Sequence, residues 1–443
     1  MSSKSKTAAT KEEARPALVP KLRFPEFRGA EGWSEEKLDD LVHFQDGFAF
    51  KSTAFVKASE DATQVIRITD INNKNINEDK VYIPTAFLER NNLVKYGVED
   101  GDLLLSLTGA AGFNFFFWNG GPATINQRTA KVTSKRKDGH ALLRLLEPLI
   151  HEKLNERGEG QNNNLSKEFL NTIVLLVPEP AEQQKIAECL SSVDELMAAQ
   201  ARKVETLKTH KKGLMQQLFP REGETQPRLR FPEFQNAGEW EAKKLGQIAK
   251  YTKGFAFKSE DYKSQGVRII RVSDLGTDFI KPNNEKLFIS SEAEHEYARY
   301  KLTASEIIIT TVGSKPELVD SAVGRGIYVT SNNEGLLNQN LLKLEVLPGV
   351  NSRFLFSHIN TPEYQRFIAS ISRGNANQAN IAVKDLMGFI IKAPSSAEQQ
   401  RIATCLSSLD ALITAETQKY EALKTQKKGL MQQLFPSPKE VEA

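Results

Sequence analysis

Cysteine is almost absent from this chain: only Cys189 and Cys405 occur in 443 residues. So few cysteines exclude a scaffold built on disulfides and fit a reducing cytoplasm, and neither cysteine has the spacing of a metal ligand. The sequence also has no uninterrupted apolar run of about 18 residues, the length that a membrane span needs. Its first residues are charged where a secretion signal would be apolar. We therefore expect a cytoplasmic protein with no membrane partner.

The sequence motifs of common enzymes are lacking as well. There is no phosphate-binding G-x-x-x-x-G-K loop, no G-x-G-x-x-G after a strand, and no Asn-Pro-Pro or Asp-Pro-Pro start of the tetrad that amino-methyltransferases use. The 6 histidines form no H-E-x-x-H pair. A formal charge of +3 permits a nucleic-acid partner without requiring one. We predict a non-enzymatic chain with no catalytic residue, no metal site and no cofactor of its own.

What the sequence does contain is an internal repeat. The segment KGLMQQLFP occurs twice without change, at 212–220 and at 428–436. Identity over that length indicates a duplication. It closes a longer match between 181–220 and 397–436. Two shorter segments repeat in the same way: KLRFPEF at 21–27 with RLRFPEF at 228–234, and GFAFKS at 47–52 with 254–259.

Between these repeated segments the two copies diverge. VIRITDIN (65–72) still resembles IIRVSDLG (269–276), and Asn126-Gln127 parallels Asn338-Gln339. Other stretches, such as LTGAAGFNFFFWNGG, have no counterpart. The chain therefore repeats constant segments around two different inserts, which predicts two modules of one architecture with different surfaces.

The repeated segments 180–220 and 395–436 have the apolar period of long helices. Polar residues interrupt both apolar seams at the same places, Gln200 or Glu416 and Lys211 or Lys427, as in coiled coils whose register is specified. The predicted seam residues are Ile186, Leu190, Val193, Met197 and Leu207, with Leu214, in the first helix, and Ile402, Leu406, Leu409, Ile413, Leu423 and Leu430 in the second.

Start and stop signals bound both helices. The first begins at a Pro-x-Glu at 180–182, and the second at 395–398 has the S-x-x-E spacing of a capping box. Pro220 and Pro436 predict the ends, because proline cannot continue a helix. Such a helix is roughly 55 Å long at about 1.5 Å per residue, too long to bury its seam within one small domain.

We therefore predict that the two helices pack on each other as an antiparallel coiled coil with a pseudo-two-fold axis. An alternative stays open, in which each helix packs only on its own module.

Gly213 and Gly429 lie in the last turns of the predicted helices. Each weakens a helix by roughly 1 kcal/mol relative to alanine. The sequence leaves open whether they end the helix early or allow two backbones to approach closely. It also leaves open whether the unchanged segment around them docks a partner at each copy or only completes the helix pairing. The candidates for docking are Lys211, Lys212, Gln216 and Gln217.

The modules between the helices are predicted to be mixed α and β, about 150 residues each. Six runs read as strands: TQVIRIT, DLLLSLT and TIVLLVP in the first module, and GVRIIRV, EIIITTV and GFIIKAP in the second. The predicted organisation is a disordered tail at 1–19, a module at 20–179, a spacer helix at 180–220, a linker at 221–227, a module at 228–394, a spacer helix at 395–436 and a tail at 437–443.

Polar loops are the candidate binding sites. Asn and Gln can pair with adenine and Arg with guanine. For any one such loop, however, a plain solvated turn is the default interpretation, and base reading is the alternative. In GFAFKS, the phenylalanines are interpreted as core anchors rather than base-stacking platforms, and the lysines and serines as phosphate contacts. The candidates are Lys51, Ser52, Thr108, Gln127, Arg128, Asn162, Asn163, Lys258, Ser259, Gln339, Asn375 and Asn377.

Taken together, a proline-flanked E-Q-x-x-I at the head of a long helix, GFAFKS in each module, and two variable modules alternating with near-identical helices resemble the specificity subunits of Type I restriction-modification systems. The resemblance covers nearly all of residues 20–436. It implies a non-catalytic subunit in which each variable module, a target recognition domain, reads one half of a bipartite double-stranded DNA target. The paired helices would hold the two modules at a fixed separation.

The resemblance also implies partners. Two modification subunits would dock on the chain and carry S-adenosylmethionine and adenine-N6 methylation, so that S-adenosylmethionine, ATP and Mg belong to partner subunits. Whether two restriction subunits join them stays open. Because the two modules differ in sequence, the DNA target should be asymmetric. Two other hypotheses remain: a coiled-coil scaffold with two protein-binding modules, and an enzyme with an unrecognised site.

Overall fold

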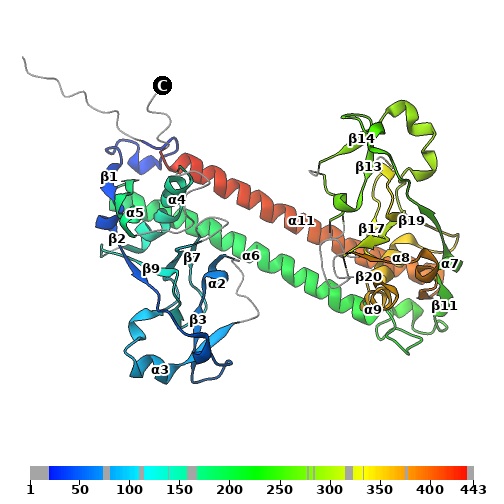
Figure 1. Cartoon of the computed structure of the whole chain (residues 1–443), viewed down its shortest axis with the longest axis horizontal. Helices are drawn as coiled ribbons and strands as arrows, with labels where there is room; N and C mark the ends of the chain where they lie inside the picture. The colour runs from blue at the N-terminus through cyan, green and yellow to red at the C-terminus, as the bar shows by residue number, and fades with distance from the viewer. Residues whose placement is uncertain are drawn as a thin grey trace, which may run out of the picture. The chain divides into compact units, whose positions relative to one another are not determined.

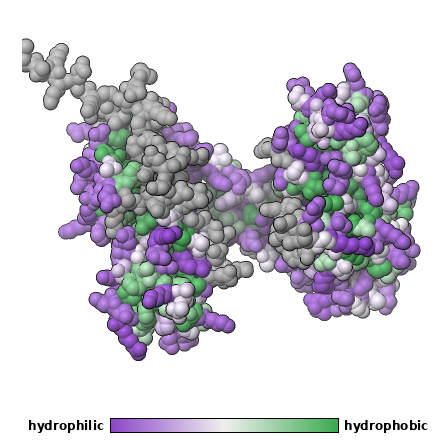
Figure 2. Space-filling view, in the orientation of Figure 1, coloured by the Kyte–Doolittle hydropathy of each residue, from purple (hydrophilic) through white to green (hydrophobic). Residues whose placement is uncertain are grey.

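The computed structural model describes residues 19–72, 80–108, 114–137, 139–156, 167–276, 279–282, 285–314, 323–332, 334–374 and 378–436. The chain is mixed helix and sheet and divides into two compact units (Figure 1). Unit 1 comprises 1–199 with 420–443, and unit 2 comprises 200–419. The division cuts through both long helices, because each contributes one part to each unit. On the face drawn in Figure 2, hydrophilic residues cover most of each unit, with smaller apolar patches between them.

Unit 1 contains two four-stranded sheets and a two-stranded ladder. In the second sheet β3 and β8 run parallel, whereas the other strand pairs of this unit are antiparallel. The first sheet has the order β2 (Val42–Asp46), β9 (Thr129–Ser134), β6 (Leu103–Ser106), β7 (Phe115–Phe117). The second has the order β4 (Val81–Pro84), β3 (Ala62–Ile66), β8 (Ala123–Ile125), β5 (Gly97–Val98), and the ladder joins β1 (Ser34–Lys37) to β10 (Val174–Val177).

Unit 2 repeats this topology, again with one parallel pair, β13 with β18. Its first sheet has the order β12 (Ala249–Lys253), β19 (Leu341–Val346), β15 (Ile307–Thr310), β17 (Gly326–Tyr328). The second has the order β14 (Leu287–Ile289), β13 (Val267–Ile270), β18 (Leu336–Leu337), and the ladder joins β11 (Glu241–Lys244) to β22 (Ile390–Ala393). A small sheet of β16 (Val312–Gly313), β21 (Ala379–Asn380) and β20 (Arg373–Gly374) is added. The modules thus keep one strand order even where their sequences do not align.

The six predicted strand runs all form strands, β3, β6, β10, β13, β15 and β22. In β6 and β15 the continuous apolar character follows from burial on both faces. Leu103 and Leu105 pack in the core beneath the helices, while Leu104 points into the core on the other face of the sheet. In β15, Ile307 and Ile308 divide between two cores in the same way.

The shorter helices cover the sheets. In unit 1, α4 packs against the first sheet through Leu142, Leu145 and Leu149. The shorter helices of unit 1 are α1 (Leu38–Leu41), α2 (Ile68–Asn72), α3 (Thr85–Arg90), α4 (Gly139–Glu156) and α5 (Lys167–Thr172). Those of unit 2 are α7 (Leu245–Ile248), α8 (Ser352–Ile359), α9 (Pro362–Ile371) and α10 (Val383–Leu386). These layers complete two domains of mixed structure, as the sequence predicted.

The two long helices are α6 (Pro180–Leu218) and α11 (Ser396–Leu434). Within unit 2 they run antiparallel, because Lys211 near the end of α6 pairs with Asp410 near the start of α11. Within unit 1, Lys427 of α11 pairs with Asp194 of α6 at 2.7 Å. The alternative in which each helix packs only on its own module is therefore wrong.

The apolar seams are buried most deeply at their ends. Ile186 and Leu190 lie in one core with Leu434, and Ile402 and Leu406 lie in another with Leu218. The other predicted seam residues are half-buried: Val193, Met197, Leu207, Leu214, Leu409, Ile413, Leu423 and Leu430. Every seam position therefore faces away from open solvent at least in part.

The polar interruption in the middle of the seams is a hydrogen-bonded cluster. Gln200 Nε2 donates to the Glu416 carboxylate at 2.6 Å and to its backbone oxygen at 2.8 Å. Lys203 and Lys419 lie 3.1 and 3.0 Å from the same carboxylate. The hydrogen bond from Gln200, with those from the two lysines, lowers the pKa of Glu416 to about 2. A charged group thus sits in the seam with all its partners supplied by the two helices.

The head of each helix is held by a buried ion pair that the sequence did not reveal. Arg23 donates two hydrogen bonds to Glu182 at 2.8 and 2.7 Å, and Arg230 does the same to Glu398 at 2.7 Å each. The predicted capping box at 395–398 is therefore only half formed. Ser395 Oγ accepts from the Glu398 backbone at 3.4 Å, but the Glu398 side chain binds Arg230 instead of the cap.

The unchanged segment at the end of each helix packs on a tryptophan. Phe219 meets Trp240 with ring centroids 6.3 Å apart, and Phe435 meets Trp33 at 5.7 Å. The helices run through Gly213 and Gly429, and a Cβ added at either glycine would have no neighbour within 4 Å. Neither glycine ends its helix, and neither serves a close approach within the described part of the chain.

His358 on α8 gives unit 2 a pH-dependent stability. Its ring lies between Phe219 and Phe354, with centroids 4.8 and 5.3 Å away, and burial lowers its pKa from 6.5 to about 4. Between those values the unfolded chain binds a proton that the folded chain does not, so stability is complete above pH 6.5 and falls below it.

We predict that the free energy of unfolding of unit 2 falls by about 3 kcal/mol between pH 7.5 and pH 4, because the unfolded chain binds a proton at His358 more tightly. Urea unfolding across that range, compared between the natural chain and His358→Leu, measures it. The variant should have a smaller pH dependence, since leucine takes up no proton. Equal slopes for both chains would show that His358 does not titrate in this way.

Candidate nucleic-acid interface

The candidate site lies where two parallel strands end. In unit 1, β3 and β8 pair with Ile66 opposite Ile125. Parallel strands end at the same edge of a sheet, so the residues that follow them lie together. The turn 67–70 follows β3 and the turn 126–128 follows β8, and the Asn126 N–H donates to the Ile66 carbonyl at 2.9 Å.

The GFAFKS segment joins this edge as a third loop. Phe48 N–H donates to the Ile125 carbonyl at 3.1 Å, and Gln127 N–H donates to the Phe48 carbonyl at 3.0 Å. The Asn126 side chain accepts from the Phe50 backbone at 3.3 Å. Glycine is required at position 47, because a Cβ there would lie 2.1 Å from the Asn126 carbonyl oxygen. We call loops 47–52, 67–70 and 126–128 the three-loop edge of unit 1.

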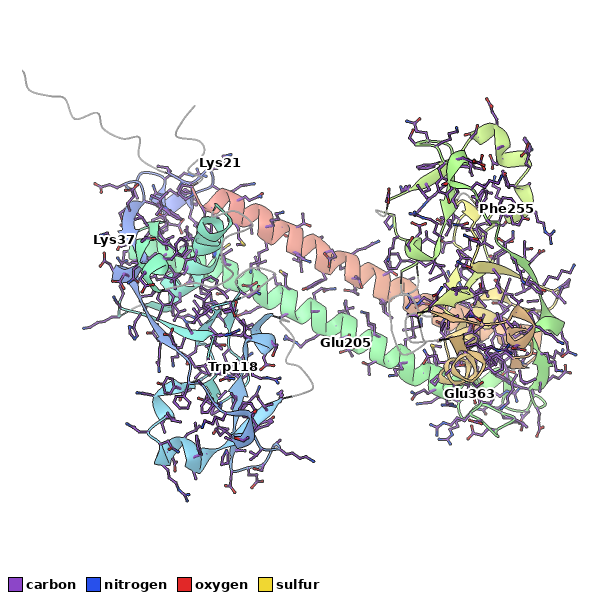
Figure 3. All side chains as sticks on the ribbon, viewed as in Figure 1. Lys21, Lys37, Trp118, Glu205, Phe255 and Glu363 are labelled. Carbon is purple, nitrogen blue, oxygen red and sulfur yellow. The ribbon has the colours of Figure 1, made fainter. Side chains whose placement is uncertain are left out.

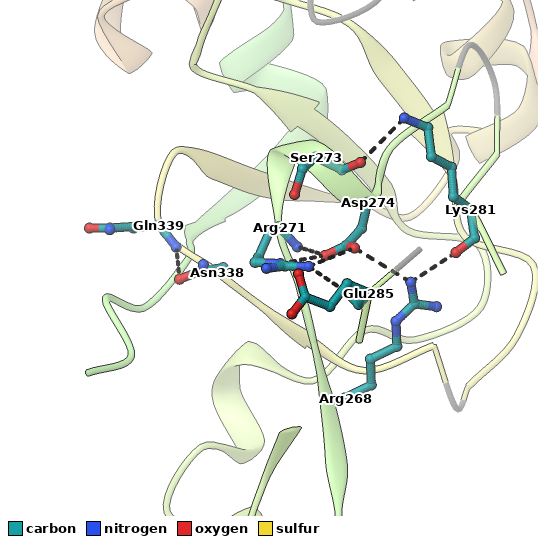
Figure 4. Close-up of polar contacts among 8 residues, drawn as sticks. All are labelled: Arg268, Arg271, Ser273, Asp274, Lys281, Glu285, Asn338 and Gln339. Carbon is teal, nitrogen blue, oxygen red and sulfur yellow. Dashed lines mark hydrogen bonds and ion pairs between the residues drawn. The ribbon is translucent and has the colours of Figure 1, made fainter. Parts of the chain in front are cut away.

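Unit 2 has the same three-loop edge, made of 254–259, 271–274 and 338–340. Asn338 N–H donates to the Ile270 carbonyl at 3.0 Å, and Gln339 N–H donates to the Phe255 carbonyl at 2.8 Å. Gln339 N–H also donates to Asn338 Oδ1 at 2.8 Å (Figure 4). A Cβ at Gly254 would lie 1.9 Å from the Asn338 carbonyl oxygen. The repeat of GFAFKS and of Asn-Gln in the sequence therefore reflects a repeated loop geometry.

The GFAFKS side chains divide between core and surface. Phe50 and Phe257 are buried, and each packs on the preceding phenylalanine with centroids 5.0 and 5.1 Å apart. This packing supports their interpretation as core anchors. The four polar residues that follow are exposed, namely Lys51, Ser52, Lys258 and Ser259.

The turn after the first parallel strand is built on an arginine–aspartate pair that sequence reasoning missed. Arg271 donates to Asp274 at 3.1 Å through Nε, and Arg268 lies 3.8 Å from the same carboxylate, which has no exposure to solvent (Figure 4). In unit 1, Arg67 Nε donates to Asp70 at 3.2 Å in the same way. The sequence signal that could have revealed these pairs is the resemblance between VIRITDIN and IIRVSDLG, which both contain the arginine and the aspartate.

This turn presents one hydroxyl residue in each unit. Thr69 and Ser273 are exposed between the arginine and the aspartate. Neither was among the sequence candidates.

The remaining sequence candidates fall into two groups. Three candidates are exposed on the turns of the two edges, namely Gln127, Arg128 and Gln339. Thr108 is half-buried beside the turn 126–128, because the N–H of the preceding Leu107 donates to the Arg128 carbonyl at 2.8 Å. Four candidates lie outside the described residues, namely Asn162, Asn163, Asn375 and Asn377.

The chemistry that these edges offer is hydrogen bonding. Each presents amide, hydroxyl and cationic groups on loops that backbone hydrogen bonds hold to the sheet. In the part of the chain that the structure describes, no group of three or more His, Cys, Asp or Glu could hold a metal ion. Nor is any helix there long and apolar enough to cross a membrane.

Two modules of one topology, each with a polar three-loop edge and each completed by parts of two antiparallel helices, define a chain with two related but different recognition surfaces. The family model "Type I restriction modification DNA specificity domain" matches the chain twice, over residues 30–209 and 237–425. The chain therefore belongs to the family of Type I restriction-modification specificity subunits, which confirms the resemblance found in its sequence.

Known proteins agree with this assignment. The chain is 24% identical over 349 residues to the Type I restriction enzyme MjaVIII specificity subunit of Methanocaldococcus jannaschii, covering 76% of this chain and 79% of that one. It is 25% identical over 410 residues to the EcoBI specificity subunit of Escherichia coli, covering 86% and 80%. The crystal structure of the S subunit from M. genitalium matches its fold with a TM-score of 0.58 at 14% identity, over 95% of this chain and 100% of that one.

The close approach at Gly254 predicts a specific sensitivity. Gly254→Ala should lower the free energy of unfolding of unit 2 by about 2 kcal/mol, because the methyl group overlaps the backbone of Asn338. Gly213→Ala is the matched control, since its methyl group meets open space in a helix and should raise stability by up to about 1 kcal/mol. Urea unfolding measures both. If Gly254→Ala proved as stable as the natural chain, the loop geometry described here would be wrong.

Proposed function

We propose that each three-loop edge reads one half of a bipartite, asymmetric double-stranded DNA target. The observation that carries the proposal is that the same exposed loop positions recur in both units, with the same side chain at some positions, such as Gln127 and Gln339, and different ones at others, such as Arg128 and Asn340. Membership in the specificity-subunit family supplies the class of ligand. In this proposal the chain performs no catalysis. S-adenosylmethionine, ATP and Mg act in partner subunits.

Within each edge the side chains have different tasks. Lys51 and Lys258, with Ser52 and Ser259 beside them, contact phosphates, which positions the protein without reading sequence. The exposed residues of the turns, such as Gln127, read base edges. Because some of these turn residues differ between the edges, as Thr69 does from Ser273 and Arg128 from Asn340, the two half-sites differ as well.

The long helices set the gap between the half-sites. Lys211 aligns with Lys427 in the repeat, and Asp194 aligns with Asp410. The ion pairs Lys211–Asp410 and Lys427–Asp194 are therefore equivalent contacts. Gln200 and Glu416 align with each other in the repeat, so a two-fold rotation that exchanges the helices would map this pair onto itself. Contacts of this kind are expected of an antiparallel coiled coil with a pseudo-two-fold axis through Gln200 and Glu416. Such a rod would hold the two readers at a fixed separation.

The duplicated surfaces dock two identical modification subunits. Large apolar residues are exposed at equivalent positions of the two copies: Leu22 with Leu229, Val174 with Ile390, and Leu196 with Leu412. The open space over Gly213 and Gly429 leaves room for a partner's backbone. Among the docking candidates, Lys212, Gln216 and Gln217 are exposed, whereas Lys211 is taken up by Asp410.

Co-expression with the modification subunit of the same genome tests the proposed function. The host should lack other adenine methylation, and its DNA is sequenced for N6-methyladenine. One bipartite, asymmetric motif with a fixed gap is the expected result. A stable complex without methylation would favour the competing hypothesis, a scaffold that joins proteins and has no role on DNA.

The docking surfaces predict a separate effect on assembly. Leu196→Gln with Leu412→Gln should weaken the complex with the modification subunit by about tenfold per site or more, since burying a leucine contributes about 1.5–3 kcal/mol. The control is Glu205→Gln with Glu421→Gln, which changes exposed residues at another pair of equivalent positions (Figure 3). Titration of the purified proteins measures both affinities. Equal affinities for the two variants would place the docking surface elsewhere.

A further inference from the structure

Position 128 in unit 1 and position 340 in unit 2 share an unusual backbone conformation. Arg128 and Asn340 each have a φ of 68° in the turn that follows the second parallel strand. For most residues with a Cβ this left-handed conformation costs about 1–2 kcal/mol, so that Arg128 is strained, whereas glycine adopts it freely and asparagine tolerates it better than other residues. Both copies nevertheless have a side chain there, an arginine in one and an asparagine in the other. Strain of this kind, where glycine would relieve it, points to a use for the side chain.

The backbone at this position is fixed from both sides. The Arg128 carbonyl accepts from the Leu107 N–H at 2.8 Å, and the Asn340 carbonyl accepts from the Thr311 N–H at the same distance. The preceding residue is held by Asn126 Oδ1, which accepts from the Gln127 N–H at 2.9 Å. The two side chains therefore leave equivalent points of two equivalent loops.

Both side chains are exposed and have no hydrogen bond or ion pair with any residue that the structure describes. The other arginines of the edges differ in this respect, because Arg67 and Arg271 are bound to the aspartates of their turns. A planar, charged group with five donors is thus left unused in unit 1. An amide with both donors and an acceptor is left unused in unit 2.

We propose that the residue at this position determines specificity in each module, an inference that rests on the proposed function. Arg128 selects a guanine, and Asn340 selects an adenine. An arginine side chain matches guanine O6 and N7 with two hydrogen bonds, and an asparagine side chain matches adenine N6 and N7. The same loop would then read different bases in the two half-sites through one exchange of side chain.

The test is the pair of exchanges Arg128→Asn and Asn340→Arg, each made in the full chain and co-expressed with the modification subunit. Sequencing of N6-methyladenine gives the motif of each variant. Arg128→Asn should reduce the preference for guanine at one position of one half-site by about tenfold to a hundredfold and leave the other half-site unchanged. Asn340→Arg should do the same for an adenine in the other half-site.

Glycine variants separate recognition from folding. Arg128→Gly and Asn340→Gly relieve the strained backbone, so their melting temperatures should equal or exceed that of the natural chain, and each should lose preference at the same base position. Lys51→Ala, a phosphate contact, should weaken methylation at all sites and leave the motif as it is. Suppose that the natural chain methylates a bipartite target and that none of the four variants at positions 128 and 340 changes the motif. This result would overturn the present inference and leave the proposed function standing. Absence of any bipartite motif from the natural chain overturns the proposed function itself.

Discussion

A buried arginine–glutamate pair at the head of each long helix is the contact on which both modules depend. Glu182 and Glu398 are almost fully buried, and Arg23 or Arg230 donates a hydrogen bond to each of the two carboxylate oxygens. Removing one partner of such a pair typically costs about 3–5 kcal/mol, since the other charge is left buried. The pair joins the first segment of each module to the helix that follows it, and so explains why these two segments repeat while the residues between them diverge.

This arrangement separates the fold from the loops that we propose to bind DNA. Strand order, the close approach at Gly47 and Gly254, and the turns built on Asp70 and Asp274 are common to both units. The exposed side chains carried by those loops are shared only in part: Gln127 matches Gln339, whereas Arg128 differs from Asn340.

The sequence predicted the long helices and the strands well, because apolar periodicity depends on burial alone, as Ile186 and Leu190 show. It could not show that Gln200 and Glu416 bind each other, since pairing across two helices is not a local signal. It also placed LTGAAGFNFFFWNGG apart from any counterpart, yet β7 and β17 have the same place in their sheets, because ladder hydrogen bonds need no particular side chains. Asn340 was missed because the left-handed backbone angle that distinguishes it cannot be read from the sequence.

A chain with two copies of one module tests the central claim most directly. Residues 34–177 would be replaced by 241–393, with the junctions at the strands of the matching ladders β1–β10 and β11–β22. The N6-methyladenine motif of its complex with the modification subunit should be a palindrome, with the half-site of unit 2 on both sides of an unchanged gap. A motif that keeps both original half-sites would contradict the account, because recognition would then lie outside the modules.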